Sequence, residues 1–318
     1  MEIKKFLRSF VFVLLLIVVA DFAVGKLLNY LYFKQRSGEL YATTYAINKS
    51  EASCVIFGSS RARHHYNSII LQKELQDSFY NTGQSGQSIF YTAAVANAML
   101  SRYTPKLVII DVRPDEFTRE RESLAPLLPY KNNPAIKPFF VYNGKFENVK
   151  LLSQTYPYNS MMTTILMGFK KEPKKVTEDM GYKPLTRAIK NKAFTEFNEG
   201  KTIDTGAVKV FTDLLELLDK KHIPNLVICS PLYAHYNDGP SIKLIKEISA
   251  RYSGTTFYSY LNDERYKDVN LFADFYHMNH NGADVFSEEI AGKIKLKLQE
   301  PKTGEQPAGI VPPAAVSK

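Results

Sequence analysis

The sequence is poor in cysteine, with only Cys54 and Cys229 in 318 residues. Two isolated cysteines in so long a chain are no disulfide framework, although a single disulfide between them stays open. Both lie in apolar runs typical of buried strands, where free cysteine behaves as a small hydrophobic residue. No lipoprotein-type cysteine follows the hydrophobic N-terminus.

Nucleic-acid motifs are also absent, although the net charge is +9. The positive residues gather at the N-terminus, in Lys170–Lys175, and in the final helix and tail, without the interleaved aromatics that stack on bases. We expect no nucleic-acid partner. An anionic envelope polymer or a membrane surface suits the basic charge better.

The N-terminus carries an uncharged apolar run, Ser9–Ala20, preceded by Lys4, Lys5 and Arg8. From Phe6 to Gly25 the chain is about long enough to span a bilayer if the flanking charges snorkel. We expect residues 1–26 to be a single-pass anchor in the cell membrane, with a cytoplasmic N-terminus. The rest of the chain would then be extracytoplasmic, and periplasmic if the envelope has two membranes. A cleaved signal peptide and a buried helix are the alternatives, but no clean small-x-small cleavage site is present.

Composition and pattern predict one large folded domain, with 45% hydrophobic and 23% charged residues. Apolar runs and helical periodicities alternate from residue 51 to 299, which predicts a flavodoxin-like three-layer α/β/α fold with a parallel sheet of about five strands. A linker helix is expected at 27–50, a helical insertion at 118–205 and a disordered tail at 300–318. The predicted strands are Cys54–Phe57, Ser78–Asn81, Leu107–Val112, Leu226–Cys229 and Thr256–Tyr258.

Two distant stretches carry candidate chemistry. The run Cys54–Phe57 stops at Gly58-Ser59-Ser60, a tight turn that can hold a serine hydroxyl at the end of a sheet. Serine needs a neighbouring base, and the stretch Asp274-Phe275-Tyr276-His277 offers an imidazole with a carboxylate to fix its tautomer. A Gly-rich loop, Asn81–Ser88, follows the second strand. Because all three follow strands of one parallel sheet, we expect them to meet at its carboxyl edge.

These residues resemble the SGNH/GDSL hydrolase superfamily. The chain is similar above all to its membrane-anchored envelope branch, which includes alginate O-acetylation proteins and the protein assisting D-alanylation of teichoic acids. Gly58-Ser59-Ser60 matches the first block, with Ser60 as nucleophile. Asn81-x-Gly83-x-Ser85-Gly86 matches the second, in which the glycine N–H at Gly86 helps form the oxyanion hole. Asp274-x-x-His277 matches the last block.

One family block departs from the pattern. The family commonly has Gly-x-Asn-Asp after the third strand, where the asparagine donates to the oxyanion. Here the strand runs into Asp111-Val112-Arg113-Pro114-Asp115 without an asparagine. Loss of a comparable donor costs about a hundredfold or more in rate. Arg113 is a candidate substitute.

Each assignment has a structural alternative. Ser60 could cap a helix, Ser59 could be the nucleophile instead, and His277 could be a surface histidine. Arg61 and Arg63 could bind an anionic substrate or only solvate the rim of the crevice. The aromatic residues of the insertion suit a cap core better than a sugar platform. A metal site that combines Asp274, His277 and His280 with His64 and His65 lacks an acidic cluster to complete it.

The resemblance implies acyl transfer through a serine ester, without a cofactor. Ser60, His277 and Asp274 would be catalytic, while Gly86, Asn81, Arg61 and Arg113 would bind the oxyanion or the substrate. The expected substrate is an acylated envelope polysaccharide, a cell-wall glycan or a small acyl ester. A multi-pass membrane protein that donates the acyl group is an expected partner. The alternative is an inactive SGNH-fold scaffold or glycan-binding module.

Overall fold

The computed structural model describes residues 2–168, 179–190 and 193–299. Its centre is a five-stranded parallel sheet with the order β2-β1-β3-β5-β7. This is the flavodoxin-like strand order, and the order reverses at β1 and β3. The prediction of a parallel sheet of about five strands is therefore confirmed. The strands are β1 (Cys54–Phe57), β2 (Phe79–Asn81), β3 (Leu107–Asp111), β5 (Asn225–Cys229) and β7 (Thr255–Ser259).

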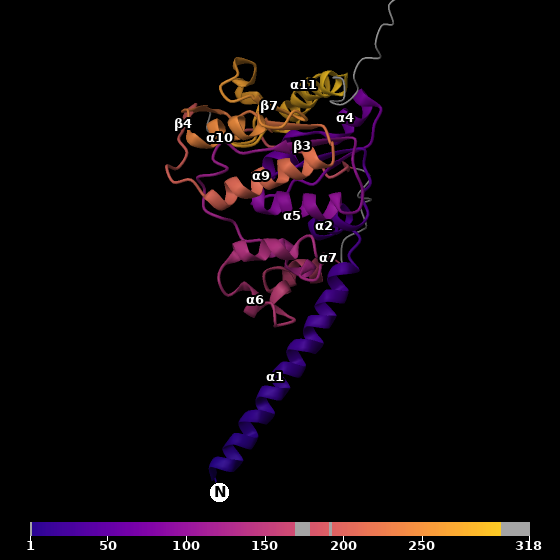
Figure 1. Cartoon of the computed structure of the whole chain (residues 1–318), viewed down its shortest axis with the longest axis vertical. Coiled ribbons are helices and arrows are strands. Elements are labelled where there is room, and N and C mark those ends of the chain that lie inside the picture. The colour runs from indigo at the N-terminus through magenta and orange to yellow at the C-terminus, as the bar shows by residue number, and fades with distance from the viewer. Residues whose placement is uncertain (1, 169–178, 191–192, 300–318) are drawn as a thin grey trace, which may run out of the picture.

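Helices cover both faces of the sheet, because successive strand residues point to opposite sides. Val55 and Phe57 face one core, whereas Cys54 and Ile56 face the other. Figure 1 shows α5 and α9 on one side of the sheet and α4 and α11 on the other. The first core is covered by α2 (Gly38–Asn48), α5 (Ile89–Leu100), α9 (Thr205–Lys220) and α10 (Pro240–Ser249). The second is covered by α3 (Ser60–His65), α4 (Ser68–Leu75) and α11 (His280–Gln299).

The N-terminal helix α1 (Glu2–Phe33) is long and apolar enough to cross a membrane. Its first half extends away from the rest of the chain, as Figure 1 shows. The last turns of α1 belong to the domain, since Leu28 and Tyr32 are buried in the core. The next helix, α2, packs against α5. Residues 27–50, which include the end of α1 and all of α2, therefore contribute to the core and also connect α1 to the rest of the domain.

The first part of the insertion between β3 and α9, residues 118–168, lies at the α1 end of the sheet domain, beside the last turns of α1 (Figure 1). It contains short helical turns, several of them opened by proline, because no long apolar periodicity supports a longer helix. These turns are η1 (Ala125–Tyr130), η2 (Lys137–Asn143), α6 (Glu147–Lys150), η3 (Tyr156–Met161) and α7 (Met162–Gly168).

Further along, β4 (Thr195–Phe197) pairs with β6 (Ala234–Tyr236) in a small second sheet, which the sequence pattern did not predict. Two short 3-10 turns, η4 (Glu264–Tyr266) and η5 (Val269–Leu271), precede α11. The lysine-rich run at 170–175 and the tail predicted at 300–318 lie outside the described residues.

Candidate active site

The turn after β1 requires glycine. Gly58 has φ +148°, and a Cβ there would lie 2.7 Å from the Asp111 carbonyl oxygen and 2.8 Å from the Ala62 Cβ. The chain can therefore pass close to the end of β3 and begin α3 at once. Ser59 caps this helix, because its Oγ accepts the Arg61 N–H at 3.3 Å. Ser60 is the first helical residue.

The structure brings Ser60, and not Ser59, to the imidazole of His277. The Ser60 Oγ lies 2.8 Å from His277 Nε2, and His277 Nδ1 lies 2.8 Å from Asp274 Oδ1. Asp274 Oδ1 also accepts the backbone N–H groups of Tyr276 and His277, each at 3.0 Å. The three-residue spacing thus forms a turn that holds carboxylate and imidazole together, although 217 residues separate Ser60 from His277.

The charge on Asp274 fixes the tautomer of His277. Burial alone would raise the pKa of this carboxyl, but hydrogen bonds from His277, the Tyr276 N–H and Arg187 hold it well below its usual range. The ionised carboxylate can only accept, so His277 Nδ1 carries the proton and Nε2 accepts from the Ser60 hydroxyl. The serine therefore faces a free imidazole lone pair, which is the arrangement that general-base activation of a hydroxyl requires.

His65 ties the nucleophile helix to the histidine loop. It is fully buried, its Nε2 accepts the Met278 N–H at 3.0 Å, and its Nδ1 lies 2.9 Å from Ser230 Oγ. Burial and the neighbouring Arg61 charge lower the pKa of His65 well below its usual value, so the ring is neutral. Since Nε2 accepts, Nδ1–H donates to Ser230. Met278 directly follows His277, so this bond places the loop that holds the base.

His64 contacts the same imidazole from another side. Its Nδ1 lies 2.6 Å from the Lys183 carbonyl oxygen, and its ring meets the His277 ring edge-on with centroids 5.6 Å apart. Burial lowers the pKa of His64 to about 4. The two neighbouring histidines are thus uncharged packing partners of His277. Within the described residues, no group of three or more His, Cys, Asp or Glu side chains is placed to hold a metal.

Two arginines expected at the substrate lie elsewhere. Arg61 is buried, donates to the carbonyl and hydroxyl oxygens of Ser230, and lies 3.8 Å from Asp111. Arg113 is 6% exposed, and its guanidinium lies 3.0 Å from Glu122 and 3.3 Å from Asp115. The expectations of a rim arginine and of a substitute oxyanion donor are corrected accordingly, because carboxylates and backbone oxygens already engage both side chains.

The side chain of Asn81 also forms hydrogen bonds within the protein. Its amide NH₂ donates to the carbonyl oxygens of Ala62 and Tyr66 at 2.7 and 3.2 Å, and its Oδ1 accepts the Gly83 N–H at 2.9 Å. The side chain therefore joins the second strand to α3 rather than pointing to a ligand. Gly86 has φ +69° in an exposed turn with open space around it, and its N–H has no partner among the described residues.

The third strand, β3, ends in a buried carboxylate, Asp111. Asp111 accepts the Tyr66 hydroxyl at 2.7 Å and lies beside Arg61. Burial raises the pKa of Asp111, and the positive charge of Arg61 opposes that rise. This network lies beneath α3 and holds the nucleophile helix against the sheet.

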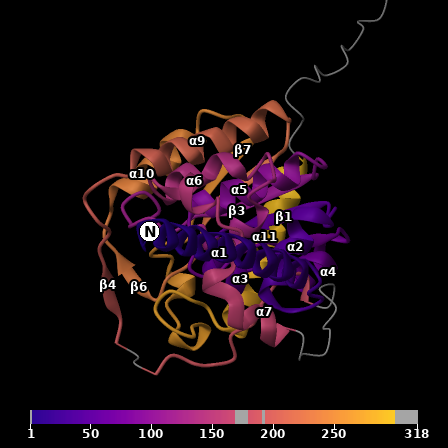
Figure 2. The ribbon, with the colours of Figure 1, turned by 90° about the horizontal axis from the view of Figure 1, so that it is seen from below.

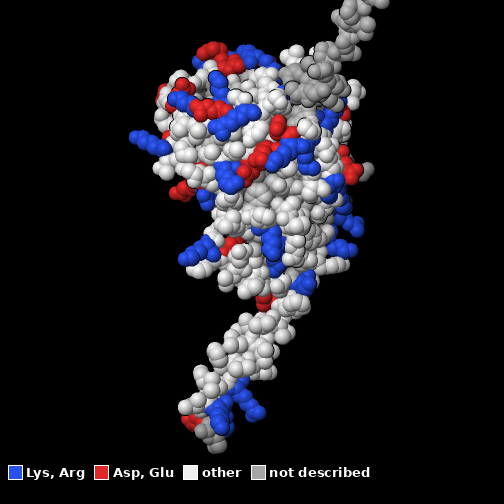
Figure 3. All heavy atoms as spheres, in the orientation of Figure 1, with Lys and Arg blue, Asp and Glu red and all other residues white. Residues whose placement is uncertain are grey.

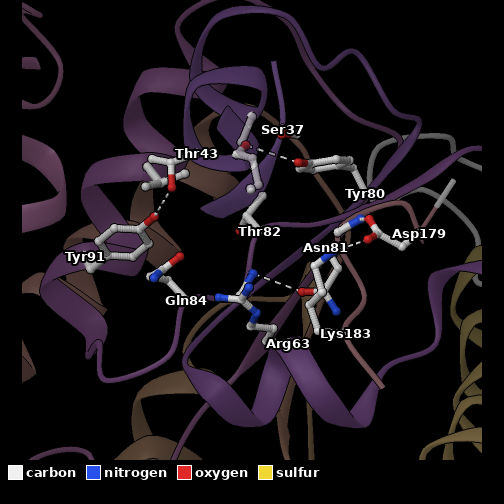
Figure 4. A pocket seen from close by; sticks show the side chains of 16 residues that line it. Ser37, Thr43, Arg63, Tyr80, Asn81, Thr82, Gln84, Tyr91, Asp179 and Lys183 are labelled. Atoms are coloured by element: carbon white, nitrogen blue, oxygen red, sulfur yellow. Dashed lines mark hydrogen bonds and ion pairs between the residues drawn. The ribbon is translucent and has the colours of Figure 1, made fainter. Parts of the chain in front are cut away.

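A cavity of about 460 Å³ lies beside the nucleophile turn, between α2, β2 and α5 (Figure 4). Arg63 and the Gly83–Gln84 loop line it, whereas Ser60 and His277 do not. A Cβ on Gly83 would lie 2.4 Å from the Arg63 nitrogen and 2.9 Å from the Ser59 carbonyl oxygen, so this loop is the wall between cavity and turn. Arg63 pairs with Glu39 at 2.8 Å, and Tyr91 bonds to Thr43 at 3.2 Å.

Comparison with known proteins finds no matching family model and no matching curated protein. Solved structures do match. A Streptococcus pneumonia protein provisionally described as a platelet activating factor is 11% identical, with TM-score 0.42, over 86% of this chain and 98% of that one. A provisionally described lipolytic protein of the G-D-S-L family from Desulfitobacterium hafniense DCB-2 is 11% identical, with TM-score 0.35, over 75% and 97%.

A two-domain esterase (CEX) active on acetylated mannans is 13% identical, with TM-score 0.37, over 82% of this chain and 53% of that one. One of the three solved structures is described by the G-D-S-L family, the group that the sequence motifs resemble. At these identities and TM-scores the likeness carries no argument about activity, which depends on the geometry of the site itself.

Proposed function

We propose that the chain is a membrane-anchored serine esterase or O-acyltransferase of the SGNH/GDSL kind. The observation that carries this proposal is the hydrogen-bonded series Ser60–His277–Asp274, in which both links measure 2.8 Å. A nucleophile, a base and a residue that orients the base are the three parts that acyl transfer through serine needs. The neutral, buried histidines beside His277 support the proposal, since they add no positive charge to the base.

The chemistry transfers the acyl group twice, first from the substrate ester to Ser60 and then from Ser60 to the acceptor. Ser60 Oγ attacks the carbonyl carbon of an acyl ester while His277 Nε2 takes the hydroxyl proton. The tetrahedral intermediate collapses, the substrate C–O bond breaks, and His277 returns the proton to the departing alcohol. Water or a second hydroxyl then attacks the Ser60 ester while His277 Nε2 takes its proton. The bond between the acyl group and Ser60 Oγ breaks, and His277 returns the proton to Ser60 Oγ. Water as acceptor makes an esterase, and a sugar hydroxyl makes an O-acyltransferase.

Backbone donors would stabilise the oxyanion. The Ser60 N–H is at the first position of α3 and has no partner within the helix. The Gly86 N–H, in the loop after β2, would be the second donor. Such donors stabilise the negative charge that develops in the transition state.

The substrate class follows from the anchor and the resemblance. An α1 that crosses a bilayer with Lys4, Lys5 and Arg8 on the cytoplasmic side would place the triad outside the cytoplasm. An acylated envelope polysaccharide or cell-wall glycan is then within reach. A multi-pass membrane protein is the proposed source of the acyl group where the reaction is a transfer.

A serine-directed fluorophosphonate tests the proposal on the full-length protein in detergent, because Leu28 and Tyr32 of α1 belong to the core. Peptide mass spectrometry should find the adduct on Ser60. The adduct should disappear in His277→Ala and persist in His280→Ala, a matched control with an exposed histidine three residues away.

Each other outcome has a definite meaning. An adduct on Ser59 would contradict the assignment of the nucleophile. A folded protein that gives no adduct, and that binds glycans without hydrolysing a chromogenic acetyl ester, would favour the inactive binding module.

A further inference from the structure

Exposed apolar side chains gather on the insertion, next to α1. Outside α1, the described residues include twelve exposed large hydrophobic side chains, and seven of them lie between residues 141 and 167. The other five are scattered over the sheet domain and the loops around it. Six of the seven are more than half exposed: Val141, Phe146, Val149, Leu152, Leu166 and Met167. Patches of this kind mark interaction sites on soluble domains.

A wider segment around these side chains, residues 131–168, is basic. It contains four lysines and one acidic residue, Glu147, which gives a net charge of +3 (4 − 1). Glu147 is buried and bonded to Tyr156 and Asn143, so its charge does not face outward. Lys137, Lys145 and Lys150 are exposed. Exposed apolar side chains among lysines suit an anionic lipid surface, which attracts basic side chains next to a membrane helix.

Hydrogen bonds hold the insertion against α1 at one position along the helix. Asp21 accepts hydrogen bonds from Ser153 Oγ at 2.7 Å, the Gln154 N–H at 2.7 Å, and the Thr155 N–H and Oγ1 at 3.1 and 2.6 Å. A Cβ on Gly25 would lie 2.3 Å from Gln154 Cβ, so loop and helix are in close contact. Lys131 donates to the carbonyl oxygens of residues 151 and 153, near the Asp21 charge. The bonds from residues 153–155 give the Asp21 carboxylate partners within the protein.

Helix geometry then places this contact inside the bilayer. The uncharged run Ser9–Ala20 spans only about 18 Å, against a hydrocarbon thickness of about 30 Å. A span of about 30 Å needs Phe6 to Gly25, which puts Asp21 about 6 Å below the outer boundary of the hydrocarbon. The loop bonded to Asp21, with Leu152 beside it, shares that depth.

We infer that the insertion is a membrane-docking unit whose apolar side chains enter the outer leaflet around α1. Figure 2 shows α6 and α7 on either side of α1, so the unit contacts lipid on two sides of the helix. Figure 3 shows lysine and arginine side chains around the same end of the domain. The inference depends on the proposed membrane anchoring. Docking would hold the domain at a fixed height and orientation above the bilayer.

Depth-dependent fluorescence tests this on the full chain. Single cysteines are added at Leu152, Phe146, Ile69 and Leu15 and labelled with an environment-sensitive dye. Cys54 and Cys229 do not interfere, since both are buried and burial raises the pKa of the Cys54 thiol to about 12. The protein is placed in nanodiscs of phosphatidylcholine and phosphatidylglycerol in equal parts, with and without doxyl-labelled lipid.

The four positions separate the possible outcomes. Labels at Leu152→Cys and Phe146→Cys should shift to the blue and be quenched several-fold more than the label at Ile69→Cys, an exposed site on α4. The Leu15→Cys label reports on α1 itself. If it is quenched while positions 146 and 152 behave like position 69, docking is refuted and the anchor stands. If position 15 is not quenched, the anchor fails and docking fails with it.

Discussion

His65 offers the most informative single substitution, because it connects two parts of the site without touching a substrate. Its Nε2 is the acceptor of the Met278 N–H at 3.0 Å, and the ring is fully buried. His65→Ala would leave that N–H without a partner, which costs about 1–3 kcal/mol. The cavity left by the ring adds to the loss, so we expect the free energy of unfolding to fall by about 3–5 kcal/mol in total.

The rate should fall as well, because Met278 follows His277. A displacement of about 1 Å at a catalytic group can lower the rate about a hundredfold. In the proposed reaction the imidazole acts in the chemical step, so kcat on a chromogenic acetyl ester should fall while KM changes little. The rate of fluorophosphonate labelling at Ser60 should fall in parallel.

His65→Gln is the matched control. Its amide oxygen can accept the Met278 N–H in place of Nε2, so it should restore most of the rate even where stability stays low. Measurements belong at a temperature where urea titration shows each variant folded. If His65→Ala lowers stability but leaves kcat of the folded protein unchanged, the bond to Met278 does not position the base and the reasoning is refuted.

The cap of α3, the second neutral histidine and the Asp21 contact each give a further measurable outcome. Ser59→Ala should lower the free energy of unfolding by about 0.5–2 kcal/mol, because the helix cap is lost, yet it should keep fluorophosphonate labelling. Loss of labelling in the folded variant would contradict Ser60 as the nucleophile. Burial lowers the pKa of His64 from 6.5 to about 4, so the unfolded chain binds a proton that the folded chain does not. The free energy of unfolding should therefore fall as pH falls from 6.5 towards 4, and a urea series in which His64→Gln does not flatten that slope would count against the assignment. Asp21→Ala should speed amide hydrogen exchange at Gln154 and Thr155, whose N–H groups donate to Asp21; unchanged exchange would show that the loop is held by other contacts.

The fold, and the proximity of Ser60, His277 and Asp274, could be predicted because their signals are local. Each strand is a short apolar run bounded by turn residues, and each helix shows its own periodicity, so the alternation alone predicts the parallel sheet. Ser60 ends such a run, and Asp274 lies three residues before His277. The topology then brings the two stretches together, since both follow strands at the same edge.

The residues that support Asp274 and His277 could not be identified from the sequence around them. His65 is bonded to Ser230 and Met278, which are 165 and 213 residues away, and nothing near His65 indicates either contact. Arg187 likewise meets Asp274 across 87 residues. Sequence reasoning considered His64 and His65 only as metal ligands, whereas burial makes them neutral partners of the base.

The two misplaced arginines show a different limit. An arginine near a catalytic motif is equally compatible with a substrate contact and with a buried pair, because burial depends on tertiary partners. Arg61 is buried against Asp111, the last residue of β3, and Ser230, which directly follows β5. The insertion was also hard to predict, since proline-opened 3-10 turns leave no regular period to read.

The carboxylates around Arg113 bear on the rate that the site can reach. Arg113 pairs with Asp115 and Glu122, and its backbone N–H donates to Glu116 at 2.9 Å, so its positive charge is compensated away from the oxyanion. With Arg113 paired to carboxylates and Asn81 bonded to backbone, the proposed oxyanion site keeps only backbone N–H groups. A site that lacks one side-chain donor is expected to be about 10²–10³ slower than one that has it. Slow attack by water would leave the Ser60 ester intact for longer. A long-lived serine ester can wait for a sugar hydroxyl to bind, so slow hydrolysis suits the proposed transfer to a sugar.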